Sequence, residues 1–189
     1  MPIEDARRWD QRYAQDQRFR TFTQPRPFLI EQAGWLPEGG LALDVAMGLG
    51  GNAAFLLERG LRVVGLDISW VAVQRAKQRL PDLMAVQADL TRFSLPSRTF
   101  DIILNFYYLE RNLWVDYCRW LKPGGILMIE TLTRDMLAIQ PEIDPAFLLD
   151  SGELFRAFCD LEILAYREGR QVSRDGHTSA VASLVARKA

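Results

Sequence analysis

The stretch that decides the fold is LALDVAMGLGGN, residues 41–52. Its apolar first part, residues 41–47, leads directly into three glycines at positions 48, 50 and 51. An apolar run of this length predicts a buried strand, and the glycines predict a tight turn into a helix. Such a turn brings main-chain N–H groups and a helix N-terminus close to a ligand. The stretch therefore predicts a cofactor-binding loop.

The glycine spacing in this loop differs from the pattern of dinucleotide-binding enzymes. Those enzymes use GxGxxG, in which the middle glycine admits a pyrophosphate. Here Gly48-Leu49-Gly50 supplies the first two glycines, but the third is missing. An NAD(P)-binding oxidoreductase therefore stays open as an alternative, and the loop alone does not decide the ligand.

Strand-then-helix units follow one another along the chain. The predicted strands span residues 41–47, 62–68, 83–89, 101–109 and 126–131, and the predicted helices after the first, second and fourth of them span residues 51–60, 70–80 and 110–121. Strands that are apolar on both faces, in alternation with helices, indicate a parallel sheet covered on both sides. Two further extended runs, 161–170 and 179–189, are separated by a segment containing Asp175-Gly176 and predict an antiparallel hairpin. We expect a doubly wound, Rossmann-like α/β fold with a seven-stranded sheet, mostly parallel, closed by an antiparallel C-terminal hairpin strand.

Helices are also predicted before the sheet and after its fifth strand. Residues 4–19 form one amphipathic helix, in which Trp9 and Tyr13 lie four apart and share a face, and residues 25–37 form a second helix. An irregular stretch, 132–150, is followed by a short helix over residues 151–158. The two aromatic side chains either dock the first helix on the core or cover a binding site.

Composition excludes several classes of function. The 189 residues carry 23 Lys and Arg against 24 Asp and Glu, a net charge of -1, which disfavours a nucleic-acid partner held through phosphates. Two cysteines and one histidine supply neither a disulfide framework nor a zinc site, so no metal is predicted. The chain also lacks an apolar run of membrane-spanning length and a recognisable secretory signal, so a cytoplasmic protein is expected. The oligomeric state is not predicted.

Carboxylates lie at or near the ends of the first three predicted strands. Asp44 lies inside the first strand just before the loop, Asp67 ends the second and Asp89 ends the third. In an open α/β sheet, ligands bind outside the carboxyl ends of the strands. A ligand with an ammonium group, a ribose diol and an adenine amine would use all three acids, whereas a diphosphate would be repelled. Each acid also has a simpler interpretation as a helix cap.

At this point the sequence resembles the class I S-adenosylmethionine-dependent methyltransferases. The resemblance is carried in order by LDVAMGLG, VVGLDIS, QADL, FDIILNFYYL and LKPGGILMIET, and by the antiparallel hairpin. WDQRY near the start and the tail LLDSGELFRAFCDLEILAYREG resemble the tellurite-resistance and thiopurine type of small-molecule methyltransferase. The loop departs from that type at Met47 and Gly51, where the family usually has Cys and Arg.

The resemblance implies S-adenosyl-L-methionine as the cofactor and S-adenosylhomocysteine as the product. Asp44 would lie near the amino group, Asp67 would accept the ribose hydroxyls and Asp89 would accept from the adenine amine. Ile68 would pack on the adenine, and Asn105, taken as the end of the fourth strand, would lie near the methyl group. The full predicted cofactor set is Asp44, Ala46, Met47, Gly48, Gly50, Asn52, Asp67, Ile68, Asp89, Leu90 and Asn105.

The expected organisation is a single methyltransferase domain over residues 1–189. Its parts are an N-terminal helical lid (1–36), a cofactor-binding half (37–131), and a substrate-side segment with the C-terminal hairpin (132–189). Arg134 and Phe147 are expected in the variable wall of the substrate pocket.

The expected methyl acceptor is a small molecule. Because His177 lies near a turn, no imidazole base is evident, which favours a thiol or chalcogen nucleophile and leaves an amine or oxygen possible. Tyr107, Tyr108 and Arg111 are the substrate-side candidates, since they follow a strand end, although packing explains them equally well. A non-catalytic cofactor-binding protein with the same fold is a further alternative.

Overall fold

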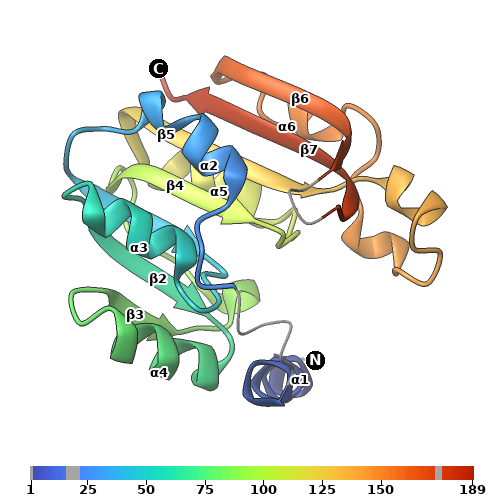
Figure 1. The fold of residues 1–189 in the computed structure, drawn as a ribbon. Coiled ribbons are helices and arrows are strands. Elements are labelled where there is room, and N and C mark those ends of the chain that lie inside the picture. The colour runs from blue at the N-terminus through green and yellow to red at the C-terminus, as the bar shows by residue number, and fades with distance from the viewer. Residues whose placement is uncertain (1, 16–21, 173–175) are drawn as a thin grey trace.

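The computed structural model describes residues 2–15, 22–172 and 176–189 (Figure 1). In these residues seven strands form one sheet in the order β3-β2-β1-β4-β5-β7-β6. The strands are β1 (Leu41–Val45), β2 (Arg62–Asp67), β3 (Met84–Gln87), β4 (Phe100–Phe106), β5 (Leu121–Leu132), β6 (Glu162–Val172) and β7 (Thr178–Arg187). The first five are parallel where they pair, and β7 lies between β5 and β6, antiparallel to both. The predicted doubly wound fold with its C-terminal hairpin is confirmed.

Helices cover both faces of the sheet because each presents an apolar stripe to it. On one face, α2 (Pro27–Glu31), α3 (Gly51–Glu58) and α4 (Trp70–Arg79) contribute to a core with the apolar side chains of β1, β2, β4 and β5. On the other face, α5 (Leu113–Trp120) and α6 (Glu153–Ala157) pack around the buried Tyr117 and Trp120. Helix α1 (Pro2–Gln15) packs beside α4 (Figure 1).

Short 3-10 helices lie in the connections. They are η2 (Ala33–Trp35), η3 (Leu90–Arg92), η4 (Arg134–Ala138) and η5 (Pro145–Phe147). The last two lie in the segment 132–150, which was predicted to be irregular. The predicted single helix over 25–37 is instead divided into α2 and η2, since Gly34 and its neighbours tighten into a 3-10 turn.

Two predicted helix boundaries are confirmed by their capping groups. Ser69 caps α4, because its hydroxyl accepts a hydrogen bond from the Ala72 N–H at 3.1 Å. Gly60 follows α3 in the left-handed conformation, at φ 82°. Two other parts of the predictions, the end of the first helix beyond Gln15 and the turn residue Asp175, lie outside the described residues.

Several strands end earlier than predicted; β1, for example, ends at Val45 and not at residue 47. β3 ends at Gln87, so Asp89 follows the strand and caps η3 instead of ending the strand. β4 ends at Phe106 because Tyr107 adopts a left-handed conformation, φ 59°, that a strand does not accommodate. Asn105 therefore lies inside β4 and not at its end.

The predicted breaker KPGG, residues 122–125, does not precede the fifth strand but lies within it. β5 begins at Leu121, and its register with β4 shifts between Phe100 and Ile102. The glycine pair is therefore part of a bulge that leaves the pairing with β4 intact on either side.

Among the helices that the structure describes, none combines the length and the apolar character needed to cross a bilayer.

Candidate functional site

The loop after β1 turns sharply toward α3 through left-handed residues. Ala46, Gly48 and Gly50 have φ angles of 53°, 56° and 73°. This conformation is unfavourable for alanine, so the surrounding contacts must hold it. The Met47 N–H donates to the Leu66 carbonyl at 2.9 Å, which fastens the loop to the end of β2.

Asp67, the last residue of β2, holds this loop in place. One of its carboxylate oxygens accepts from the Gly48 N–H at 2.8 Å and the other from the Ser69 N–H at 2.9 Å. Burial raises the pKa of Asp67 to about 6, although these hydrogen bonds oppose the shift. Each oxygen has a second lone pair, so the carboxylate retains the capacity to accept hydrogen bonds from a ligand diol.

Asp44 is buried beneath the loop, and one of its oxygens is unsatisfied. The residue is 1% exposed, and its Oδ2 atom has no hydrogen-bond donor in the described structure. Burial is the main cause that raises its pKa to about 7, the charge of Asp67 adds to the shift, and a hydrogen bond from the Ala53 N–H opposes it. A buried carboxylate oxygen without a donor is costly, and an ammonium group would satisfy it.

Asp89 has the capping role that the simpler interpretation predicted. It accepts hydrogen bonds from the Thr91 N–H at 3.0 Å and the Thr91 hydroxyl at 2.7 Å. Burial is the main cause that raises the pKa of Tyr108, and the charges of Glu110, Asp89, Asp5 and Asp67 add to this shift. Asp89 and Asp67 therefore both influence Tyr108, near the carboxyl ends of the strands.

The structure explains both departures from the family's loop. The Met47 side chain points into the core and fills the space beside Gly65 of β2, where a Cβ atom would overlap its sulfur. At Gly51 a Cβ atom would overlap the Gln24 carbonyl oxygen, because the segment before α2 crosses the N-terminus of α3 there. Glycine at position 51 thus allows that segment to approach.

Helix α1 is fastened over the start of α4, close to the loop. The Asp10 carboxylate accepts from the Ser69 hydroxyl at 2.6 Å and from the Val71 N–H at 3.0 Å, and the Arg75 guanidinium donates to the Tyr13 carbonyl at 2.5 Å. The Tyr13 hydroxyl lies beside Gly48, and burial together with Asp67 raises its pKa. The sequence singled out Tyr13, as a side chain that docks the first helix or covers a site, but it did not single out Asp10, although WDQRY carries both.

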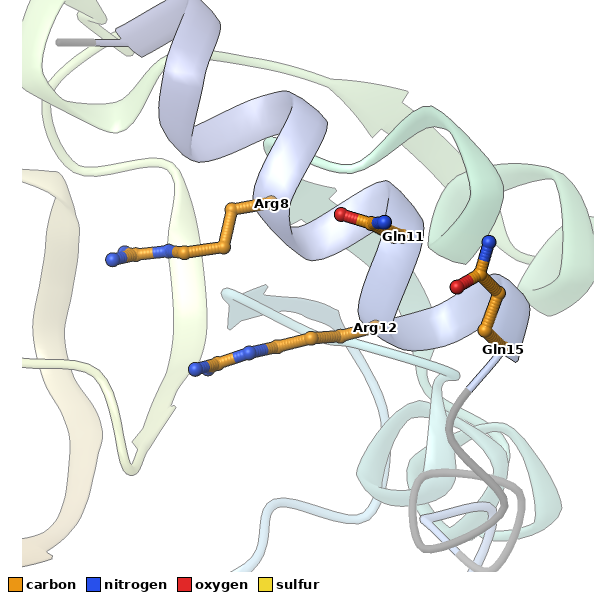
Figure 2. Close-up of a pocket in the computed structure, with 4 residues that line it drawn as sticks. All are labelled: Arg8, Gln11, Arg12 and Gln15. Carbon is orange, nitrogen blue, oxygen red and sulfur yellow. The ribbon is translucent and has the colours of Figure 1, made fainter.

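Figure 2 shows the hollow beside α1. Four side chains of α1 line this space of about 310 Å³: Arg8, Gln11, Arg12 and Gln15. Arg8 and Arg12 extend from the helix in the same direction (Figure 2).

Asn52 and Asn105 have partners that the sequence did not reveal. The Asn52 Oδ1 atom accepts from the Arg26 N–H at 2.9 Å, which ties the segment before α2 to α3. The Asn105 amide donates to the Tyr117 hydroxyl at 2.8 Å, and its Oδ1 atom has no partner in the described residues. Because Asn105 pairs with Val45 across the strands, it faces the opposite side of the sheet from Asp44.

The three substrate-side candidates lie in different surroundings. The Tyr107 hydroxyl donates to the Glu130 carboxylate at 3.2 Å, and burial together with the charges of nearby acids raises the pKa of Tyr108. Arg111 pairs with Glu153 at 2.5 Å and donates to two carbonyls of the segment 146–148, so this guanidinium is already occupied. In the predicted pocket wall, Arg134 pairs with Asp150 and Phe147 is exposed.

A buried acid, Glu130, lies near the end of β5, at the edge of the sheet formed by the carboxyl ends of the strands. Glu130, 3% exposed, accepts from the Ser183 hydroxyl at 2.6 Å and pairs with Arg167 at 3.4 Å, and Arg167 also pairs with Glu31 at 2.7 Å. No sequence motif signalled this network, since its members come from α2, β5, β6 and β7.

The fold and the residues at the carboxyl ends of the strands together identify the class of protein. A sheet of this order with an antiparallel hairpin, a glycine turn after β1 and acids in β1 and at the end of β2 is the arrangement of the class I methyltransferases. Residues 42–125 match the family described as a methyltransferase domain. The resemblance to the S-adenosylmethionine-dependent methyltransferases is therefore confirmed.

Curated relatives of this class match about half of the chain. A probable S-adenosylmethionine-dependent methyltransferase from Mycolicibacterium smegmatis is 31% identical over 98 residues, which are 49% of this chain and 38% of the relative. A malonyl-[acyl-carrier protein] O-methyltransferase from Enterobacter lignolyticus is 31% identical over 56% of this chain and 43% of the relative. A trans-aconitate 2-methyltransferase from Azoarcus sp. is 32% identical over 50% and 40%. The chain thus spans less than half the length of these relatives.

Solved structures share the fold over most of the chain. TehB from Haemophilus influenzae superposes with a TM-score of 0.73 at 17% identity, covering 87% of this chain and 62% of its own, so the two proteins share the fold. A methyltransferase from Methanosarcina mazei superposes with a TM-score of 0.69 at 18% identity, covering 87% of this chain and 98% of its own.

Proposed function

We propose that this protein is an S-adenosylmethionine-dependent methyltransferase that acts on a small-molecule nucleophile. The observation that carries the proposal is the unsatisfied Oδ2 atom of Asp44, buried beneath a left-handed turn that Asp67 holds. The methionine part of the cofactor carries an ammonium group that would satisfy this oxygen, and the ribose carries the diol that Asp67 would accept.

The proposed cofactor contacts extend from the loop to the residues at and after the ends of β2 and β3. The main chain of Ala46, Met47, Gly48 and Gly50 would line the methionine part, and Asn52 would support the loop from α3. Ile68 and Leu90 would enclose the adenine. Asp89 retains lone pairs for the adenine amine beside its capping bonds, and the free oxygen of Asn105 is a polar group on the opposite face.

The bound cofactor would supply a methyl group on a sulfonium, whose thioether leaving group needs no proton. The protein's own work is then to hold the acceptor in line with the methyl group, with reacting atoms about 3 to 3.5 Å apart, and to exclude water. Tyr13, which lies beside Gly48 under α1, is the described side chain best placed for that exclusion. This agrees with the predicted lid over residues 1–36, which stays a prediction.

A thiolate or another soft anion is the favoured nucleophile. Burial and the Glu130 charge raise the pKa of Tyr107, so this phenol stays protonated at neutral pH and is not a base. The chain's one histidine, His177, lies in the connection between β6 and β7. A thiol ionises without a strong base, whereas an ammonium group or a hydroxyl requires one. The relatives named above act on different acceptors, so an amine or oxygen acceptor stays possible.

Calorimetric titration with S-adenosylmethionine, S-adenosylhomocysteine and NADH, followed by transfer assays with methyl-labelled cofactor on thiols, amines and oxyanions, tests the proposal. We expect both sulfur compounds to bind and a thiol to be methylated. Tight binding of NADH alone would contradict the proposed function and favour an NAD(P)-binding oxidoreductase. Binding of S-adenosylhomocysteine without turnover on any acceptor would favour a non-catalytic cofactor-binding protein.

A further inference from the structure

Within the described residues Arg26 has no anionic partner, although it lies at the edge of the sheet formed by the carboxyl ends of the strands. We propose that Arg26 binds the anionic group of the methyl acceptor, so that the acceptor is a small molecule carrying a carboxylate or a similar anion. This inference rests on the proposed function, because it names the substrate class of the same site.

The backbone of Arg26 is fixed before any ligand arrives. It lies between Pro25 and Pro27, and a residue before proline is restricted to extended conformations, as its φ of -66° and ψ of 140° are. Its N–H donates to Asn52 at 2.9 Å, and its carbonyl accepts from the Ile30 N–H at 3.3 Å in the first turn of α2. A residue held in this way loses little backbone entropy on binding.

The side chain of Arg26 rests on aromatic rings and leaves its donors unused. The guanidinium carbon lies 4.5 Å from the centre of the Tyr107 ring and 5.0 Å from that of Phe22. Stacking on a ring orients the planar group and leaves its N–H edge available for a carboxylate. Burial raises the pKa values of Asp44, Tyr13 and Tyr107, and the positive charge of Arg26 opposes each of these shifts. The charge therefore acts between the cofactor loop and the end of β4.

Tyr107 is a rigid platform for this cation. Its N–H donates to the Glu130 carbonyl at 2.8 Å and its hydroxyl to the Glu130 carboxylate at 3.2 Å. These two bonds hold the tyrosine in its left-handed conformation, φ 59°. Ser183 and Arg167 in turn hold Glu130, so the support continues into β6 and β7.

Three other arginines, Arg111, Arg134 and Arg167, are neutralised, whereas Arg26 is not. Arg111 pairs with Glu153, Arg134 with Asp150, and Arg167 with both Glu31 and Glu130. The contacts of Arg26 within the described residues include neither an ion pair nor a side-chain hydrogen bond. An oriented, half-buried guanidinium without a partner is suited to a carboxylate, with which it forms a bidentate pair.

Matched pairs of charged and neutral probes test this inference without turnover. Protein saturated with S-adenosylhomocysteine is titrated by NMR with 3-mercaptopropionate and 3-mercaptopropionamide, and with benzoate and benzamide. We expect the wild type to prefer the carboxylate by about tenfold or more, Arg26→Ala to abolish the preference, and Arg26→Lys to retain part of it. Arg59→Ala is the matched control, since Arg59 also stacks on a ring, that of Phe55 at 4.4 Å, but lies at the far end of α3 and should leave the preference unchanged.

A second titration separates the acceptor from the cofactor as the source of the anion. Arg26→Ala should bind S-adenosylhomocysteine and 5′-methylthioadenosine, which lacks the amino-acid group, as the wild type does. Weaker binding of S-adenosylhomocysteine alone would assign Arg26 to the cofactor's carboxylate and overturn the inference, as would equal binding of charged and neutral probes by the wild type. A carboxylate preference that depends on Arg26 would uphold it even if no methyl transfer were found, so failure of the proposed function is distinguishable.

Discussion

The two halves of the carboxyl edge are built in different ways. In the acidic half, formed by β1 to β3, Asp67 bonds to Gly48 and Ser69, which are 19 and 2 positions away. In the half formed by β4 and β5, Glu130 bonds to Ser183, 53 positions away, and its partner Arg167 reaches Glu31 across 136 positions. The hydrogen bonds of the first half join residues of neighbouring strands, loops and helices in the chain. Those of the second half join residues that meet only when the whole sheet has formed. The same difference separates the proposed cofactor contacts from the proposed acceptor contacts.

The acidic half depends most on Asp67, so Asp67→Ala should have the largest effect. It removes the hydrogen bonds to two main-chain N–H groups and leaves the ligand diol without an acceptor. We expect S-adenosylhomocysteine to bind more weakly by about 2 kcal/mol or more, measured by calorimetry. Asp89→Ala is the control, since that partly exposed acid should matter less. An unchanged dissociation constant in a folded Asp67→Ala protein would refute this role.

The half formed by β4 and β5 can be disturbed through Gly51. In Gly51→Ala the new Cβ atom meets the Gln24 carbonyl, so the segment that carries Arg26 must move. We expect the free energy of unfolding to fall by about 1 to 3 kcal/mol in denaturant titrations. Helix propensity acts in the opposite direction, and Gly34→Ala, which meets no atom within 4 Å, should change stability by no more than about 0.5 kcal/mol. Equal free energies of unfolding for Gly51→Ala and Gly34→Ala would contradict the close approach of the Gln24 carbonyl to Gly51.

The acidic half should also make cofactor binding depend on pH. Because the pKa of Asp44 is raised to about 7, the carboxylate gains a proton as the pH falls through that value and no longer attracts an ammonium group. The affinity ratio of S-adenosylhomocysteine to 5′-methylthioadenosine should therefore fall by about tenfold between pH 8 and pH 6. The ratio cancels the contribution of Asp67, whose ribose contact both ligands share. In Asp44→Asn the ratio should be flat, and a flat ratio in the wild type would exclude the ammonium contact.

The same shift predicts the sign of a stability effect in the ligand-free protein. Between the ordinary carboxyl pKa of 3.8 and about 7, the native state binds the Asp44 proton more tightly than the unfolded state does. Stability from this group should therefore decrease as the pH rises through that range. The free energy of unfolding of Asp44→Asn, measured at several pH values, should not show the part of the pH dependence that Asp44 causes.

Arg111 should have the smallest effect of the residues considered. Its guanidinium already pairs with Glu153, and both side chains are partly exposed, so Arg111→Ala should lower stability by about 1 kcal/mol or less. Methyl transfer should change by less than about twofold, because the side chain fastens residues 146–148 and does not face an open ligand position. A large loss of turnover at unchanged stability would contradict this prediction and indicate that Arg111 contacts the methyl acceptor.

Local pattern was sufficient to predict most of the fold. The apolar strands, the left-handed glycines and the Ser69 cap are features of neighbouring residues, and they placed the strands and helices near their observed positions. Among the errors, the predicted strands were extended too far at Tyr107 and Asp89. Tyr107 is compatible with a strand by composition, and only its bonds to Glu130 impose the left-handed conformation.

The sequence by itself determined the order of the elements, the glycine turn and the acids around it, since hydrophobic period and turn chemistry are encoded within a few residues. Only the tertiary structure decided that Arg26 would rest on Tyr107, that Glu130 would be buried beside Arg167, and that Arg111 would be occupied by Glu153. These contacts join segments that are distant in the chain, and their energies depend on burial and charge in the assembled sheet.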